Sequence, residues 1–191
     1  VVSLNLLLNE KLTTIPESIR NLTELTYLNV GYNKINAIPE SIGELTKLST
    51  LSLSSNNIKE IPESIGKLTE LEELYLGENQ IPSFPEIVTQ MTNLVKLGLE
   101  GNGIKEIPES IGKLTNLIHL WLEGNNISEL PESIGELTSL KKLDLSKNSL
   151  QSLPESIKNL EDLEELDVAE NQLTKLPESF GQLGSLNTLV L

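Results

Sequence analysis

His119 is the only histidine in this chain of 191 residues, and it is the first residue that could take part in chemistry. An ordinary zinc site needs several His or Cys ligands, and the sequence contains no cysteine. A hydrolase triad would need a serine beside the histidine, but the residues predicted to surround it are Lys96, Trp121 and Lys142. We therefore predict that the chain is not an enzyme and that it uses no cofactor or metal.

Glutamate, serine and asparagine recur with a period of 23 residues and could also form polar sites. A glutamate follows each proline of one series, and a serine follows the glutamate in every copy except that of Pro85, where Ile87 stands instead. These glutamates could form a ladder that binds divalent ions, but we favour their placement at the positive N-terminal ends of short helices. The serines follow the same repeat and are not predicted nucleophiles. The prolines of the series are Pro16, Pro39, Pro62, Pro85, Pro108, Pro131, Pro154 and Pro177.

The recurring asparagines have a structural interpretation. A backbone N–H or C=O that is buried without a partner costs roughly 1–3 kcal/mol. Asparagine carries a donor and an acceptor, so a stacked row can bond to the turns above and below it. We therefore predict a buried asparagine ladder rather than a ligand site. Its members are Asn9, Asn33, Asn56, Asn79, Asn102, Asn125, Asn148 and Asn171.

Each copy of the repeat contains two hydrophobic patterns. The first alternates, as in Leu51-Ser52-Leu53, which is the period of a strand with one buried face. Nine such segments extend from Leu4 to Leu191. The second pattern has a spacing of three after the proline, as in Ile42, Leu45 and Leu48, and predicts a short 3-10 turn. One copy cannot bury its own leucines, so the copies must stack into an α/β arc with a parallel sheet on its concave face.

The motif LxxLxLxxNxI followed by xxIPESIGxLTxL resembles the leucine-rich repeat family, in its typical-length class. The second copy shows it clearly, with Leu25, Leu28, Val30, Asn33 and Ile35. The resemblance covers residues 1–191 as a single domain of about eight repeats plus a final strand. It implies a right-handed solenoid, or horseshoe, that binds proteins on its concave face. The segment NQIPSFPEIVTQMTNL departs from the motif by gaining Pro82 and Phe84, which predicts an irregular convex side there.

The composition narrows the class of partner. A net charge of −14 disfavours nucleic acid, because phosphate contacts need clustered Lys and Arg. No apolar run approaches the ~18 residues of a membrane span. A protein with a basic region is the expected partner. The compartment stays open, although we prefer a secreted or cell-surface bacterial location to a cytoplasmic one.

The repeats reach both ends of the chain without a visible cap. We therefore expect the chain to be part of something longer, or to have its ends covered by another chain. This leaves two alternatives to a simple binding module. One is the recognition segment of a larger enzyme, such as a repeat-bearing ubiquitin ligase or kinase. The other is a solenoid that self-assembles through its uncapped ends.

The variable positions of the predicted concave face carry the candidate site. Its first three strands show no charge, whereas an acidic character begins at the fourth strand. Tyr75 and Trp121 lie two strands apart, hence ~10 Å, with Gly98 between them, which predicts a shallow pocket. The other interpretation is that Trp121 merely covers its neighbours on the sheet. The candidate partner-binding residues are Tyr27, Tyr32, Glu73, Tyr75, Lys96, Glu100, His119, Trp121, Glu123 and Asp144.

Overall fold

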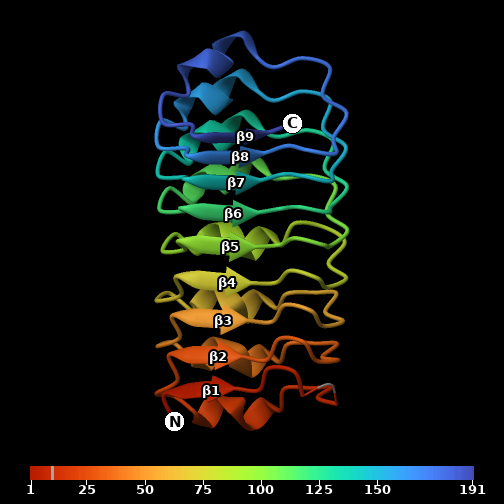
Figure 1. The fold of residues 1–191 in the computed structure, drawn as a ribbon. Helices are drawn as coiled ribbons and strands as arrows, with labels where there is room; N and C mark the ends of the chain where they lie inside the picture. Colours follow the sequence, from red (N-terminus) through yellow and green to blue (C-terminus); the bar gives the residue numbers. More distant parts are fainter. Residues whose placement is uncertain (10) are drawn as a thin grey trace.

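The computed structural model describes residues 1–9 and 11–191. This part of the chain forms nine strands that pair in sequence order into one parallel sheet, shown as a stack in Figure 1. The strands are β1 (Ser3–Asn5), β2 (Tyr27–Asn29), β3 (Thr50–Ser52), β4 (Glu73–Tyr75), β5 (Lys96–Gly98), β6 (His119–Trp121), β7 (Lys142–Asp144), β8 (Glu165–Asp167) and β9 (Thr188–Val190).

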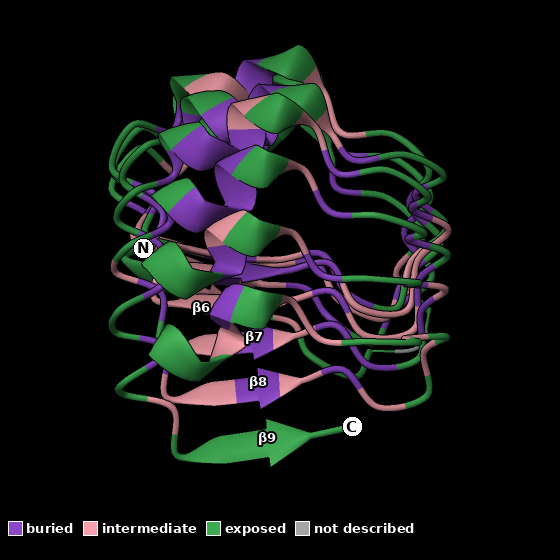
Figure 2. Ribbon diagram, turned by 90° about the horizontal axis from the view of Figure 1, so that it is seen from above, coloured by how far each residue is buried: buried purple, intermediate pink, exposed green. Residues whose placement is uncertain are grey.

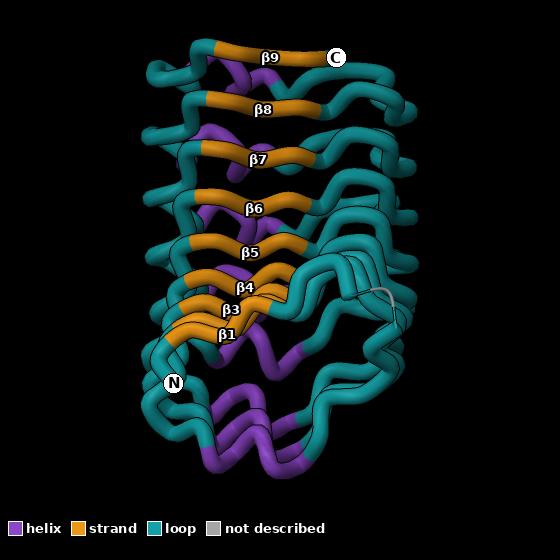
Figure 3. The backbone as a smooth tube through the Cα atoms, turned by 60° about the horizontal axis from the view of Figure 1, so that its bottom comes forward, coloured by secondary structure: helices purple, strands orange, loops and turns teal. Residues whose placement is uncertain are grey.

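A short 3-10 helix follows each of the first eight strands within the described residues. The helices are η1 (Glu17–Asn21), η2 (Glu40–Glu44), η3 (Glu63–Lys67), η4 (Glu86–Gln90), η5 (Glu109–Lys113), η6 (Glu132–Glu136), η7 (Glu155–Asn159) and η8 (Glu178–Gln182). Strands and helices lie on opposite sides of each coil (Figure 3). In Figure 1 the row of helices extends past the row of strands at both ends. The sheet therefore lies on the inner side of the curve, as the bulkier helical side requires, and the predicted solenoid is confirmed.

The register of the sheet explains which side chains reach the concave face. Every strand places a leucine at its centre, and these leucines align, as in the pairing of Leu97 with Leu120. From β2 to β8 the central leucine is buried, whereas the flanking residues are mostly half-exposed. Each strand begins one residue earlier than the alternating leucines predict, so β3 is Thr50–Ser52 rather than 51–53. The variable residues thus flank the buried leucine column.

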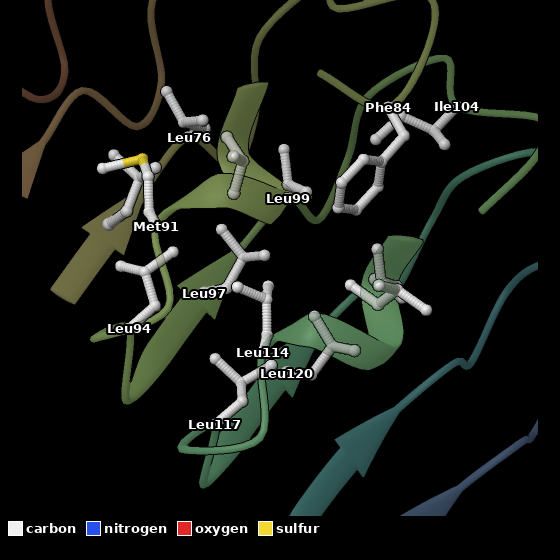
Figure 4. Close-up of a cluster of buried hydrophobic side chains, with 14 of the residues drawn as sticks. Leu76, Phe84, Met91, Leu94, Leu97, Leu99, Ile104, Leu114, Leu117 and Leu120 are labelled. Carbon is white, nitrogen blue, oxygen red and sulfur yellow. The ribbon is translucent and has the colours of Figure 1, made fainter. Parts of the chain in front are cut away.

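The helical side is regular except at η4. The prolines that precede the other helices have ψ between 146° and 154°, whereas Pro85 has ψ of 102°. Phe84, Ile87 and Met91 are buried there and fill the space beside the neighbouring coils. Figure 4 shows Phe84 near Ile104 and Met91 near Leu94, within the leucine core. The predicted irregularity is therefore present, but it is confined to the entry to one helix.

The core is a continuous column of Leu and Ile that runs through the coils. The residues that line the interior are buried, whereas the outer faces of the helices and the whole of β9 are exposed (Figure 2). Large apolar side chains are also exposed on the first coil, where Val2 and Leu8 are 59% and 61% accessible. No helix in the described part of the chain is long and apolar enough to cross a membrane.

The asparagine ladder forms as predicted from Asn33 onward. Nδ2 of Asn125 donates to the carbonyl oxygens of Leu99 and Leu122, both at 3.0 Å. Its Oδ1 accepts from the N–H of Ile104 at 3.1 Å. The side chain thus joins its own turn to the preceding coil. Asn9, which leads the series in the sequence, is exposed and differs from these buried or half-buried members.

Three of the glutamates after the prolines accept hydrogen bonds from backbone N–H groups of the next coil. Glu109 accepts from the N–H of Ser133, and Glu132 accepts from the N–H of Ser156. Glu155 accepts from the N–H groups of both Glu178 and Ser179. These contacts lower the pKa of Glu155, chiefly through the hydroxyl of Ser179. These three glutamates therefore satisfy N–H groups at the start of the following 3-10 helix that have no partner within that helix.

Candidate functional site: the concave face of the sheet

The face of β1 to β3 is uncharged and bonded to itself. Nδ2 of Asn29 donates to the hydroxyl of Tyr27 at 3.2 Å, and its Oδ1 accepts from the N–H of Gly31 at 2.9 Å. Tyr32 follows β2 with a φ of 54° and is 55% exposed. A bulky residue in this left-handed conformation is uncommon. Tyr27 and Tyr32 therefore present polar aromatic surface at one end of the sheet.

Charge begins at β4, as predicted, and is partly neutralised by ion pairs between adjacent coils. Lys96 lies 2.9 Å from Glu73, and Lys142 lies 2.8 Å from Glu165. Just before the strands begin, Lys141 pairs with Glu164, and in the turns after the strands end, Lys147 pairs with Glu123. Several carboxylates take no part in these pairs, so the face keeps a net negative charge. They are Glu72, Glu78, Glu100, Asp144, Asp167 and Glu170.

The pocket predicted over Gly98 is wrong in its position. The ring centroids of Tyr75 and Trp121 lie 6.2 Å apart, well below the ~10 Å of two strand spacings. Gly98 lies between the two residues in the sheet register, puts no side chain between their rings, and is buried. A Cβ at Gly98 would lie 3.4 Å from Cδ1 of Tyr75. The two rings and the glycine therefore form a closed aromatic surface rather than an open cleft.

Tyr75 is held in place by a carboxylate on its own strand. Its hydroxyl donates to Oε2 of Glu73 at 3.1 Å, and Glu73 also pairs with Lys96. Burial, followed by the charge of Glu73, raises the pKa of Tyr75 to about 12. The phenol therefore remains protonated and serves as a donor. The aromatic pair is thus tied to the charged residues around it.

Glu100 is the most unusual carboxylate on the face. A Cβ placed at Gly77 would overlap the Glu100 carboxylate, and one at Gly98 would lie 2.9 Å from its Oε2. The side chain therefore lies against two glycine positions, and Oε2 is buried without a hydrogen-bond partner in the described structure. Burial raises the pKa of Glu100, and the neighbouring Glu78, Glu123 and Asp144 raise it further. Glu100 thus holds its negative charge less readily than an exposed glutamate does.

His119 packs edge-on against Trp121, with ring centroids 5.3 Å apart and an interplanar angle of 60°. Burial, together with the charges of Lys96 and Lys142, lowers the pKa of His119. The imidazole is therefore neutral near pH 7 and buttresses the indole. Among the described residues, no three acidic or imidazole side chains come together as a metal-ion cluster.

A small hollow lies on the opposite side of Trp121 from Tyr75. Its volume is about 150 Å³, and Trp121, Asp144 and Asp167 form part of its lining. Lys142 and Glu165 also line it, as a pair. Asp144 and Asp167 occupy the same position on neighbouring strands. Of the candidates from the sequence, Trp121 and Asp144 meet here, and Tyr75 and Glu100 lie on the other side of the indole.

Asp167 was not among the candidate residues. The signal that could have identified it is the 23-residue period, because Asp167 stands one repeat after Asp144 and pairs with it in the sheet. Tyr27 and Tyr32 lie on β2 and the turn after it, at the far end of the sheet from this hollow. The ten candidates therefore do not form one cluster. They divide into an uncharged group and a charged aromatic group.

Comparisons with known proteins agree with this architecture. A family model described as a leucine-rich repeat region matches residues 4–99, and another described as a leucine-rich repeat matches residues 92–150 and 138–191. No curated protein sequence matches the chain.

Solved structures of repeat proteins are similar along almost the whole chain. A leucine-rich repeat protein of Leptospira interrogans is 33% identical with a TM-score of 0.80, over 95% of this chain and 52% of its own. The ectodomain of the Arabidopsis thaliana receptor kinase GASSHO1/SCHENGEN3, solved with CASPARIAN STRIP INTEGRITY FACTOR 2, is 34% identical with a TM-score of 0.78, over 98% of this chain and 26% of its own. The plant peptide hormone receptor RGFR1, solved with RGF2, is 28% identical with a TM-score of 0.73, over 98% of this chain and 34% of its own. The chain thus spans about half or less of these proteins.

Proposed function

Because the chain belongs to the leucine-rich repeat family, we propose that it is a non-catalytic recognition module that binds a protein segment on its concave face. Residues 1–191 act in this proposal as one recognition unit. The similar receptor named as binding a peptide hormone supports a peptide-like partner. The similarity to a receptor kinase ectodomain supports a further possibility, that the unit is the recognition segment of a larger protein.

The observation that carries the proposal is the aromatic pair in the middle of the charged face. Tyr75 and Trp121 are half-exposed on β4 and β6, and their rings meet across β5 on a face that nothing else in the described part of the chain covers. Tyr and Trp are enriched at the centres of protein interfaces, where water is excluded around them. Here they are surrounded by carboxylates and paired lysines, which form the polar rim that such an interface needs.

The charge distribution indicates the chemistry of the partner. The face of β1 to β3 offers Tyr27, Tyr32 and exposed leucines, whereas β4 to β8 carry the excess of carboxylates. A segment that is apolar at one end and basic at the other would be complementary to both regions. Oriented binding along the sheet follows, because the reversed segment would place its basic end on the uncharged strands.

Selection from a random peptide library tests the proposal without knowledge of the natural partner. The wild-type chain is the bait, and each enriched peptide is measured again with the Trp121→Ala and Tyr75→Ala variants and with a convex control, Glu44→Gln. We expect peptides that lose affinity with the aromatic variants and keep it with Glu44→Gln. Peptides that bind the aromatic variants as tightly as wild type would place recognition elsewhere and overturn the proposal.

A further inference from the structure

The lean of Trp121 toward Tyr75 leaves space on its other side. The centroid of the indole comes within 6.2 Å of that of the Tyr75 ring, although the two residues are two strands apart. His119 supports the indole edge-on from the same strand. The position between Trp121 and the next two strands is therefore open, and it forms the hollow of about 150 Å³.

The hollow is negatively charged. Lys142 and Glu165 in its lining neutralise one another, because their charged atoms lie 2.8 Å apart. The charges of the other two acidic residues in the lining, Asp144 and Asp167, are not neutralised by this pair. Oδ1 of Asp144 accepts from the N–H and the hydroxyl of Ser146, and Oδ1 of Asp167 accepts from the N–H of Ala169. These bonds orient each carboxylate by one oxygen, and the described residues leave each Oδ2 to accept from a partner.

The positive groups nearby do not cancel this charge. Lys142 forms an ion pair with Glu165, and Lys147, in the turn after β7, forms one with Glu123. His119 is neutral near pH 7, because burial and two lysines lower its pKa. Beyond the indole, Glu100 adds a further negative charge. A cation in the hollow would therefore face an aromatic ring and two free carboxylate oxygens.

The geometry points to a subsite for one arginine side chain, between the indole of Trp121 and the carboxylates of Asp144 and Asp167. The hollow is smaller than the ~300 Å³ of typical small-molecule sites, so it suits one side chain of a longer segment. A guanidinium stacks on an aromatic ring and donates several N–H bonds in one plane, which a lysine ammonium does not. The inference rests on the proposed function, because the arginine belongs to the segment bound along the concave face.

A fluorescence titration tests this subsite directly, since Trp121 is the only tryptophan. Three blocked pentapeptides, identical except for arginine, lysine or citrulline at the centre, are titrated into the chain. Citrulline has the shape of arginine but no charge. We expect a saturable change in the Trp121 emission with arginine, several-fold weaker binding with lysine, and no saturable response with citrulline.

Variants of the lining residues make the test specific. Asp144→Asn and Asp167→Asn should each weaken the arginine peptide about tenfold, because each removes one charged acceptor at constant shape. Glu60→Gln removes the same charge from an exposed residue before η3 and should leave the affinity unchanged. Circular dichroism checks that each variant is folded.

Several outcomes would overturn the inference. They are citrulline or lysine binding as tightly as arginine, an unchanged affinity in both aspartate variants, or an equal loss in Glu60→Gln. The proposed function stands apart from these results. Library peptides that need Trp121 but contain no arginine would remove the subsite and keep the recognition face. Library peptides that ignore the face altogether would remove the proposed function, whatever the pentapeptides do.

Discussion

The coils of β1 to β3 and those of β4 to β8 share one scaffold and differ in what they display. Both have the same strand register, the same asparagine ladder and the same short helices. At the last position of the strands the first region carries Asn5, Asn29 and Ser52, whereas the second carries Tyr75, Trp121 and Asp144. Stability and recognition are thus encoded at different positions of the same repeat. One set of residues can vary without disturbing the other.

The largest effect should come from the shared scaffold and should be equal in both regions. Asn56→Ala and Asn125→Ala each remove a buried side chain with matching bonds to the preceding coil. Each leaves several buried backbone groups unpaired, so we expect a loss of about 3 kcal/mol in the free energy of unfolding. Urea denaturation, monitored by circular dichroism, gives this free energy.

The exposed neighbours Asn57 and Asn126 provide matched controls, because the same substitution there removes no ladder bond. Both control variants should stay close to wild type. A difference of more than about 2 kcal/mol between Asn56→Ala and Asn125→Ala would break the comparison, since it would mean that the two regions are not built alike.

The second effect concerns binding and should differ between the regions. Trp121→Ala should weaken a selected peptide by roughly 2 kcal/mol, which is about thirty-fold, because it removes the centre of the aromatic surface. Tyr32→Ala changes an exposed residue at the uncharged end and should have a smaller effect. Calorimetric titration of both variants measures the contrast. If Tyr32→Ala were the more damaging, the binding centre would lie at the uncharged end.

The residues behind the first prediction could be identified from the sequence alone, whereas the packing behind the second could not. The strands, the 3-10 turns and the asparagine ladder follow from the sequence, because periodicity and hydrogen-bonding capacity repeat with the motif. The register also places Tyr75, Gly98 and Trp121 side by side. It cannot say how close the two rings come, because that depends on the side-chain rotamers around Gly98, where the Glu100 carboxylate also lies. The pocket expected over Gly98 therefore lies on the other side of Trp121.

Glu100 illustrates the same limit. Its position in the motif predicts a charged residue on the concave face, but not that its carboxylate lies against Gly77 and Gly98 with one oxygen unpaired. The two glycines were visible in the sequence as gaps in the face. Which side chain lies over these glycines depends on the rotamer of a neighbouring long side chain, here that of Glu100. Local register is thus predictable, whereas side-chain packing across coils is not.

The third prediction uses this buried charge, which has no counterpart in β1 to β3. Burial, with help from Glu78 and Glu123, raises the folded-state pKa of Glu100 above its unfolded value. The folded state therefore binds the proton more tightly, and stability falls as pH rises from the unfolded pKa through the folded one. Glu100→Gln should raise the melting temperature relative to wild type at pH 7, and this gain should shrink below the unfolded pKa.

Thermal unfolding at a series of pH values, with Glu60→Gln as the exposed control, measures this difference. The control should show a small, flat difference from wild type. A Glu100→Gln variant that is less stable than wild type at pH 7 would mean that the carboxylate makes favourable interactions, and the face of β4 to β8 would then contribute to the scaffold.

The smallest effect concerns the ion pairs that distinguish the charged region. Glu73 and Lys96 lie 2.9 Å apart, with side chains 29% and 33% exposed. A partly solvated pair of this kind contributes about 0.5 kcal/mol, since desolvation and side-chain ordering offset most of the attraction. A double-mutant cycle of Glu73→Gln and Lys96→Met, followed by urea denaturation, measures the coupling. A coupling above about 1.5 kcal/mol would show that these residues stabilise the fold as well as shape the face. In that case the residues exposed on the concave face would be independent of the stabilising residues in β1 to β3, but would themselves stabilise the fold in β4 to β8.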